Sequence, residues 1–121
     1  MRAAANEMSA TVLGPGADWG GYEAAFRSFP AGFQAGPLLK GLPQDACPVP
    51  HWCYMIKGTL RVRYTDGSED TVRPGDAFYM QPGHVPIVDE DVEFFEVSPA
   101  KEMAGLVAHI ENNIAQLAPT A

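Results

Sequence analysis

Short apolar segments, separated by turns rich in glycine and proline, fill the middle of the chain, and this pattern is the strongest constraint on its fold. The segments expected to be strands are 51–56, 59–64, 69–73, 77–81, 85–88 and 92–97. Within one of them, apolar Leu60, Val62 and Tyr64 alternate with Arg61 and Arg63, as in a strand with one buried face and one wet face. Short strands at a spacing of about ten residues are typical of an all-β sandwich or barrel.

The turns predict how some of these strands are joined. Lys57-Gly58 predicts a hairpin between 51–56 and 59–64, and Asp66-Gly67 predicts a turn before 69–73. The 121 residues include 12 glycines and 11 prolines, which favours a turn-rich fold over a helical bundle. A chain of this length suits one domain.

The N-terminal part of the chain gives weaker signals. Residues 1–18 are expected to form a poorly ordered lead-in, and 19–98 the β-barrel itself. Residues 19–43 mix aromatic residues with glycine and proline and fit one or two short strands. The segment Tyr22–Arg27 fits a helical turn as well, because its periodicity does not separate the two structures.

The C-terminal segment 99–121 is expected to be an amphipathic helix followed by a tail. Its apolar residues follow helical spacing and place the helix at 100–117. These residues are Met103, Leu106, Val107, Ile110, Ile114 and Leu117. Such a helix either covers a barrel opening or packs against a second subunit.

Charge and composition exclude several classes of partner. The net charge of −7 offers no basic surface for a nucleic acid. No segment approaches the ~20 apolar residues of a membrane-spanning helix. The first residues lack the features of a signal peptide, so we expect a cytoplasmic protein. In that compartment Cys47 and Cys53 are expected to be reduced, buried thiols, with a disulfide between them as the alternative.

Two segments resemble the sequence motifs of the cupin superfamily. Tyr54–Gly58 resembles the end of the first motif, and Gly75–His84 resembles the second. Closer still, the chain is similar to small stand-alone bacterial cupins. The features shared with them are Cys47, Pro50-His51-Trp52, Lys57-Gly58, Pro82-Gly83-His84 and Ser98-Pro99. The resemblance implies an all-β cupin double-stranded β-helix, or jelly-roll barrel, with a C-terminal α-helix. It implies no particular reaction.

The same resemblance implies where a metal ion would be held. Metal-binding cupins take two histidines and a glutamate from the first motif and a further histidine from the second, all facing the barrel interior. In this chain the glutamate position is His51, and the paired histidine positions fall near Asp45 and Cys47. The last histidine position is Pro86, with His84 two residues earlier. The usual ligand set is therefore missing.

The replacement residues are still able to bind a metal. Alternation puts His51 and Cys53 on one face of their strand. If His51 points inward, Cys47 and His84 can approach it from neighbouring loops. Cysteine and histidine with a carboxylate favour zinc among the divalent transition metals, with iron, nickel and manganese as alternatives. The structural alternative is a core His51 hydrogen-bonded to backbone and a His84 exposed in its turn.

Glu96 and Tyr79 are the candidates for proton transfer at this site. Glu96 is also a candidate fourth ligand, and burial of its carboxylate would raise its pKa unless it is paired. Alternation leaves its direction open, because either Phe94 and Glu96 or Glu93 and Phe95 point outward.

Three hypotheses for function compete. The first is a metal-dependent cupin enzyme that acts on a small molecule through an unspecified reaction. The second is a metal-free module that binds or senses a small organic molecule inside the barrel. The third is a structural homodimer, for which Trp52 and Tyr54 offer a surface. The first is favoured, since it gives the cysteine and histidines a common role, and a homodimer is compatible with all three.

Overall fold

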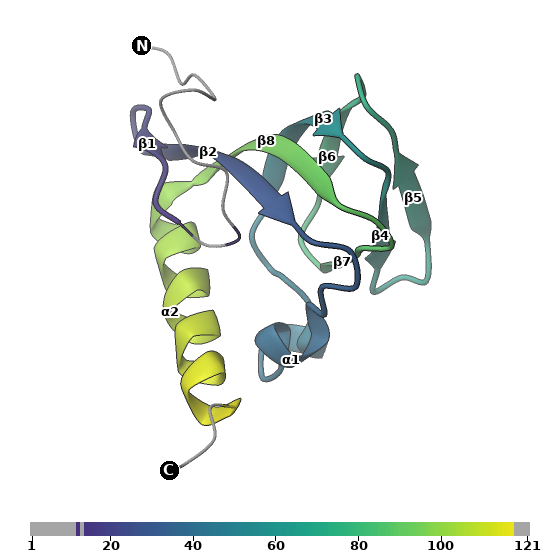
Figure 1. The fold of residues 1–121 in the computed structure, drawn as a ribbon. Coiled ribbons are helices and arrows are strands. Elements are labelled where there is room, and N and C mark those ends of the chain that lie inside the picture. The colour runs from purple at the N-terminus through teal and green to yellow at the C-terminus, as the bar shows by residue number, and fades with distance from the viewer. Residues whose placement is uncertain (1–11, 13, 118–121) are drawn as a thin grey trace.

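The computed structural model describes residue 12 and residues 14–117 (Figure 1). The strands are β1 (Ala17–Asp18), β2 (Tyr22–Phe29), β3 (His51–Lys57), β4 (Leu60–Tyr64), β5 (Glu69–Val72), β6 (Ala77–Met80), β7 (His84–Ile87) and β8 (Val92–Pro99). The helical elements are α1 (Gly36–Leu39), a 3₁₀ turn (Pro43–Asp45) and α2 (Ala100–Leu117).

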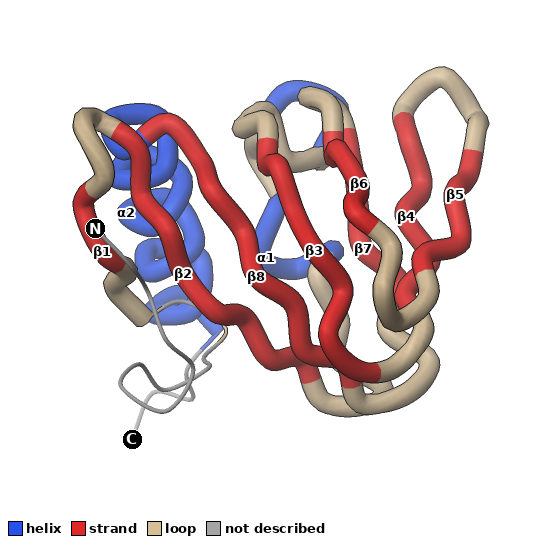
Figure 2. The backbone as a smooth tube through the Cα atoms, turned by 90° about the horizontal axis from the view of Figure 1, so that it is seen from above, coloured by secondary structure: helices blue, strands red, loops and turns tan. Residues whose placement is uncertain are grey.

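Two antiparallel sheets form the β-barrel, and Figure 2 shows β4 and β5 of one sheet on the far side of β6 from β1 and β2 of the other. The five-stranded sheet has the order β1-β2-β8-β3-β6, and the three-stranded sheet has the order β5-β4-β7. The buried residues of the inner faces form the main core, in which Met55, Leu60, Val62 and Phe94 are fully enclosed. This arrangement confirms the expected all-β fold with a C-terminal helix.

The N-terminal segments differ in part from the expectation. Most of the predicted lead-in 1–18 lies outside the described residues. Its last two residues, Ala17 and Asp18, form β1 and pair with β2. The helical alternative for Tyr22–Arg27 is wrong, because these residues belong to β2, which pairs with β8 along its whole length.

The predicted hairpin across Lys57-Gly58 is also wrong. Strand β3 pairs with β6 and β8, whereas β4 pairs with β5 and β7, so this dipeptide carries the chain from one sheet to the other. The register of β3 against β8 shifts after Met55, and such a bulge bends the strand. The predicted Asp-Gly turn is confirmed, since the amide of Tyr64 donates to the carbonyl of Ser68 and joins β4 to β5.

The crossing between the sheets depends on Gly58. Its φ is +79°, and a Cβ atom there would meet the backbone oxygen of Asp91. We expect Gly58→Ala to lower the free energy of unfolding by about 3 kcal/mol, because backbone strain adds to a steric clash. Gly67→Ala is the matched control, with φ +90° and open space around it, and should cost about 1 kcal/mol. Urea denaturation measures both, and equal losses would contradict the close packing.

Helix α2 occupies the predicted range and covers one end of the barrel (Figure 1). Its buried residues Met103, Leu106 and Ile110 pack with Leu39 of α1 and Val49 in a second core. The helix therefore buries the first part of its apolar stripe within the same chain, as the first of the two alternatives predicted, whereas Ile114 and Leu117 remain exposed. No helix in the described part of the chain is long and apolar enough to cross a membrane.

Candidate metal centre

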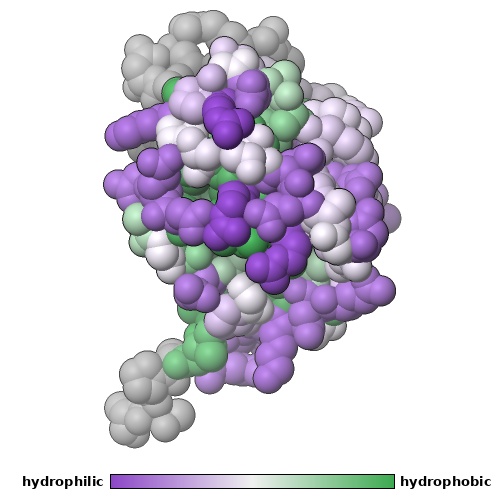
Figure 3. Space-filling model, turned by 90° about the vertical axis from the view of Figure 1, so that its right-hand side faces the viewer, coloured by the Kyte–Doolittle hydropathy of each residue, from purple (hydrophilic) through white to green (hydrophobic). Residues whose placement is uncertain are grey.

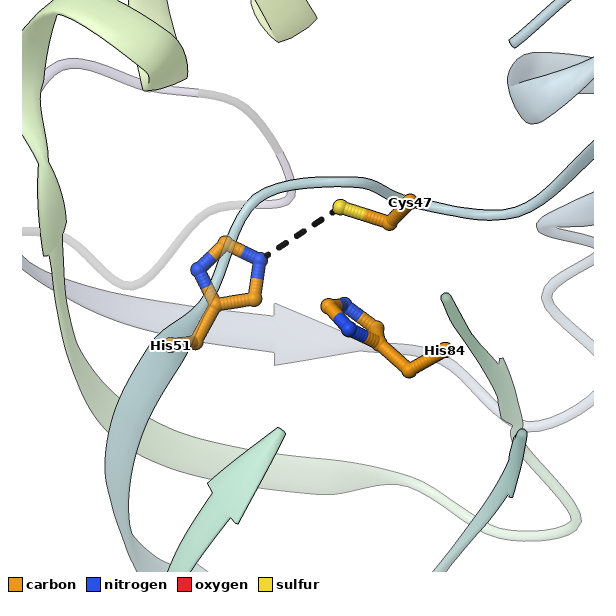
Figure 4. Close-up of side chains that lie close together, drawn as sticks. All are labelled: Cys47, His51 and His84. Atoms are coloured by element: carbon orange, nitrogen blue, oxygen red, sulfur yellow. Dashed lines mark hydrogen bonds between the residues drawn. The ribbon is translucent and has the colours of Figure 1, made fainter. Parts of the chain in front are cut away.

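Three elements bring Cys47, His51 and His84 together inside the barrel (Figure 4). His51 begins β3 and His84 begins β7. Cys47 precedes β3 and is fixed against β7 by two backbone hydrogen bonds. Its amide donates to the carbonyl of His84 (2.9 Å), and its carbonyl accepts from the amide of Gly83 (2.8 Å). Backbone pairing therefore places the thiol beside both imidazoles.

The ligand atoms of the three side chains all lie within 4.8 Å of one another. Cys47 Sγ is 3.7 Å from His51 Nε2, and the two imidazole centroids are 5.0 Å apart. With bonds of about 2.0–2.3 Å, two ligands of one tetrahedral zinc ion lie roughly 3.5 Å apart. The distance from Cys47 Sγ to His51 Nε2 already fits this value. A movement of about 1 Å by one side chain brings the other pairs of ligand atoms to the same separation. All three side chains are buried.

The hydrogen bonds of the histidines select the tautomer that a metal requires. His84 Nδ1 is 2.8 Å from the carbonyl oxygen of Gln81, which only accepts, so Nδ1 carries the proton. Ser98 Oγ donates to Glu96 Oε2 (3.4 Å) and therefore accepts from His51 Nδ1 (2.6 Å). Both rings are left with an unprotonated Nε2. Such outer contacts are the usual means of orienting metal-binding histidines.

The environment keeps both histidines neutral. Burial, together with the charge of Arg27, lowers the pKa of His51 to about 3. Burial and the neighbouring His51 lower the pKa of His84 to about 4. Burial raises the pKa of the Cys47 thiol to about 12. At neutral pH the imidazoles are thus in the form that binds metals. The thiol, in contrast, must release its proton when the ion binds.

Glu96 points into the barrel, which decides between the two directions that alternation allowed. Its Oε2 lies 3.7 Å from His51 Nδ1, on the opposite side of the ring from Cys47, so it lies behind the cluster and is not one of the three grouped ligands. It is paired instead with Arg27 Nε at 3.3 Å. As expected, burial raises the pKa of the carboxyl, although Arg27 and Ser98 oppose the shift.

Tyr79 is not brought to the site. It lies on the outer face of β6, is 46% exposed and stacks on Trp52 with ring centroids 5.3 Å apart. Its neighbour Met80 points inward and lines the cavity beside the cluster. The pleat of β6 therefore separates Tyr79 from His51, and proton transfer by its hydroxyl at this site is excluded by position.

Arg27 and Ser98 are part of the site and were not predicted from the sequence. Arg27 is fully buried and, besides Glu96, it contacts Glu23 Oε1 (2.9 Å) and the carbonyl of Gly14 (2.6 Å). Ser98 follows Glu96 by two residues, so strand alternation places both side chains on one face. Alternation could therefore place Ser98 in the site only once the direction of Glu96 was known.

The cluster lines a cavity of about 80 Å³. The remaining wall is mainly apolar and comes from β2, β8, α1 and α2. Side chains that contribute to it include Phe29, Phe94, Leu39, Leu106 and Ile110. Arg27 and Glu96 are the charged residues in the described wall. Pro86, at the position where the resemblance expects a histidine, also lines the cavity and cannot act as a ligand through its side chain.

The fold and the enclosed cluster define a small β-barrel protein with an internal polar site. Comparison with solved structures shows that this barrel is the cupin fold, a double-stranded β-helix. A cupin-2 domain containing protein from Shewanella frigidimarina matches with a TM-score of 0.51 and 16% identity, over 69% of this chain and 74% of that chain. Protein NMB1881 from Neisseria meningitidis matches with a TM-score of 0.53 and 12% identity, over 74% of this chain and 86% of that chain.

A cupin superfamily protein from Desulfitobacterium hafniense DCB-2 matches with a TM-score of 0.50 and 10% identity, over 69% of this chain and 71% of that chain. No protein-family model matches the chain, and no curated protein matches its sequence. The chain is therefore a small cupin-fold protein, as the motifs predicted. At these identities the likeness describes the fold, and the function must be argued from the site.

Proposed function

We propose that the protein binds a divalent transition metal, with zinc favoured, through Cys47, His51 and His84, and acts on a small molecule in the adjoining cavity as a metal-dependent cupin enzyme. The observation that carries the proposal is the convergence of three buried ligand atoms within 4.8 Å. Two imidazoles and a thiolate suit zinc well, and iron, nickel and manganese are the alternatives.

The residues of the chain have distinct roles in this proposal. A bound ion supplies Lewis acidity toward a ligand in the cavity. His51 and His84 bind through Nε2, and Cys47 binds as the thiolate. Ser98 holds the proton on His51 Nδ1, and Glu96, partnered by Arg27, accepts the hydrogen bond of Ser98. The apolar wall contacts the uncharged part of the ligand.

Metal analysis of tag-free protein tests the proposal. The native chain should retain or take up one zinc ion, and His51→Ala or Cys47→Ala should bind zinc about 100-fold more weakly or worse. Cys53→Ala is the matched control, because Cys53 is also a buried, free thiol but lies outside the cluster. This variant should bind zinc as the native chain does.

Two results would overturn the proposal. One is native protein that takes up less than about a tenth of an equivalent of any transition metal after incubation with excess metal. The other is equal metal binding in the native chain and His51→Ala.

The apolar wall of the cavity favours a second candidate, a metal-free module that binds a small organic molecule. Without metal the cluster already has polar contacts within the chain, since Cys47 contacts His51 and His84 contacts Gln81. A thermal-shift screen after full chelation separates the candidates. Stabilisation by organic molecules alone supports this second function, whereas stabilisation by metals alone supports the first.

Ser98→Ala should weaken zinc binding by about 10- to 100-fold while leaving the fold intact. The substitution removes the group that accepts from His51 Nδ1, so the ring is free to turn and to change its tautomer. Competition with a chromophoric chelator measures the zinc affinity, and the urea midpoint of the metal-free protein reports stability. Ser98→Thr, which keeps the hydroxyl, should restore most of the affinity. Unchanged affinity in Ser98→Ala would show that the hydrogen bond does not orient the ring.

A further inference from the structure

The charges around the cavity restrict what it can accept. Arg27 and Glu96 compensate each other, with Nε and Oε2 3.3 Å apart, and both are buried. A metal ion binds histidine as the neutral imidazole and cysteine as the thiolate. A divalent ion with the single thiolate of Cys47 would therefore leave one uncompensated positive charge beside an apolar wall. An uncompensated charge in such surroundings is costly, and a ligand of opposite charge removes that cost.

The size of the cavity gives a second restriction. A cavity of 150 Å³ lined by apolar side chains holds a benzene molecule, and the cavity here measures about 80 Å³. Within the described residues it therefore matches in size a guest of roughly four non-hydrogen atoms, which is smaller than a sugar, a nucleotide or an aromatic acid.

We propose that the ligand of this site is a small, singly charged anion with a short apolar body, such as a short-chain carboxylate. The inference rests on the proposed metal function, and it adds the class of molecule that function acts on. The anionic group lies toward Cys47, His51 and His84, and the apolar body contacts the wall formed by residues such as Phe94 and Leu106.

Cobalt-substituted protein tests this inference, because cobalt(II) reports its ligands in the visible spectrum. Metal analysis first establishes that cobalt is bound, and acetate, acetamide and benzoate are then titrated. Acetate should change the spectrum and bind at least about tenfold more tightly than acetamide, which has the same shape without the charge. Benzoate keeps the charge but exceeds the cavity and should leave the spectrum unchanged.

The outcomes separate this inference from the proposed function. Failure to bind cobalt overturns the metal site itself. If cobalt binds but acetate causes no spectral response, or acetate and acetamide cause equal responses, the proposal of an anionic ligand is wrong and the proposed metal site is unaffected. A response to benzoate equal to that of acetate overturns the size restriction, and with it the short-chain class.

A different observation concerns the outer face of the five-stranded sheet. Five large apolar side chains on this face are between 41% and 48% exposed. They are Tyr22, Trp52, Tyr54, Ile56 and Tyr79. Trp52 contacts the rings of both Tyr22 (6.4 Å) and Tyr79 (5.3 Å), so the patch is continuous across β2, β3 and β6. We call these five residues the aromatic patch.

The aromatic patch differs from the side of the molecule that carries β4 and β5. None of its five members is charged, although the chain carries a net charge of −7, and Glu93 lies on the same face toward the start of β8. The side of the molecule that carries β4 and β5 is mostly hydrophilic (Figure 3). There Arg61 pairs with Asp89 and Glu69. An aromatic side chain has roughly 150–250 Å² of surface, and a little under half of it is exposed here. The accessible area of the patch is therefore on the order of 400 Å². That is about half of one side of a standard interface.

We infer that a second copy of this chain packs on the aromatic patch. Two chains of net charge −7 repel each other wherever acidic residues meet, and an uncharged apolar face is where they approach without that cost. Two twisted sheets pack face to face over such surfaces, and a two-fold axis would stack the patch on itself. Half-buried neighbours on the same face, such as Phe95 and Val97, add to this interface.

Sedimentation equilibrium of the full chain tests this inference against the chain mass of 13.0 kDa. The native chain should sediment at twice this mass and Trp52→Glu as a monomer. Ile114→Glu is the matched control, since Ile114 is 44% exposed on α2, away from the patch, and should remain dimeric. A monomeric native chain, or a dimer that Ile114→Glu disrupts and Trp52→Glu does not, would overturn the proposal. Far-UV circular dichroism verifies that each variant is folded.

Discussion

Replacing Arg27 by methionine should lower the free energy of unfolding by about 3–5 kcal/mol. Arg27 is 1% exposed, and its Nε lies 3.3 Å from Glu96 Oε2. Methionine keeps much of the side-chain volume but leaves the carboxylate of Glu96 buried without its cation. Removing one partner of a buried ion pair costs far more than the pair contributes, because the remaining charge cannot be hydrated. Urea denaturation with a check for an unchanged m-value measures the loss.

The matched control is Arg61→Met. Arg61 also binds two carboxylates, those of Asp89 and Glu69, but its side chain is 38% exposed and the pairs are hydrated. This variant should lose far less stability than Arg27→Met, because hydrated surface ion pairs contribute little. Adding Glu96→Gln to Arg27→Met should recover part of the stability, because no buried charge then remains. If Arg27→Met were no more destabilising than Arg61→Met, the buried pair would not be a structural element of the barrel.

The strands were predictable because alternation is a local property. Leu60, Val62 and Tyr64 are buried as their spacing from Arg61 and Arg63 requires, and β4 begins and ends within a residue of the prediction. The partner of each strand is not a local property. A glycine turn is equally compatible with a hairpin and with a crossing between sheets, so Lys57-Gly58 was assigned to the wrong connection.

The candidate site was predictable to a similar extent. Alternation placed His51 and Cys53 on one face of β3, and both are buried. The approach of Cys47 and His84 depends on the pairing of residues 37 positions apart in the chain, for which the cupin resemblance was the only guide. Sequence alone did not reveal the counterion of Glu96, because Arg27 lies on a segment whose periodicity did not separate strand from helix.

Tyr79 illustrates a different limit. The short strand β6 is apolar on both faces, with Phe78 packed against the core, Tyr79 exposed and Met80 buried. An apolar outer face removes the contrast on which alternation depends, so the inward residue could not be chosen from the sequence. The same property makes Tyr79 a member of the aromatic patch, and its predicted role in proton transfer gives way to a proposed role in self-association.

The metal-free protein should lose stability steeply in mild acid. The pKa values of His51 and His84 in the folded chain, about 3 and about 4, lie below the ordinary value of 6.5. The unfolded chain therefore takes up two protons as the pH falls below 6.5, and the folded chain does not. Their contribution to stability is fully present above about pH 7 and is lost as the pH falls toward 4. The linkage between proton binding and folding gives a decrease of roughly 3–4 kcal/mol in the free energy of unfolding between pH 7.5 and pH 5.

Urea denaturation across this pH range, with a chelator present, measures the loss for the native chain and for His84→Gln. The native slope near pH 5 should be about 2.7 kcal/mol per pH unit, and removing one histidine should halve it. Cys53→Ala should lower stability at every pH without changing the slope, since its thiol takes up no proton in acid. Glu96 acts in the opposite direction, because a carboxyl with a raised pKa is protonated first in the folded chain. A slope unchanged in His84→Gln would mean that this imidazole is not held neutral by burial.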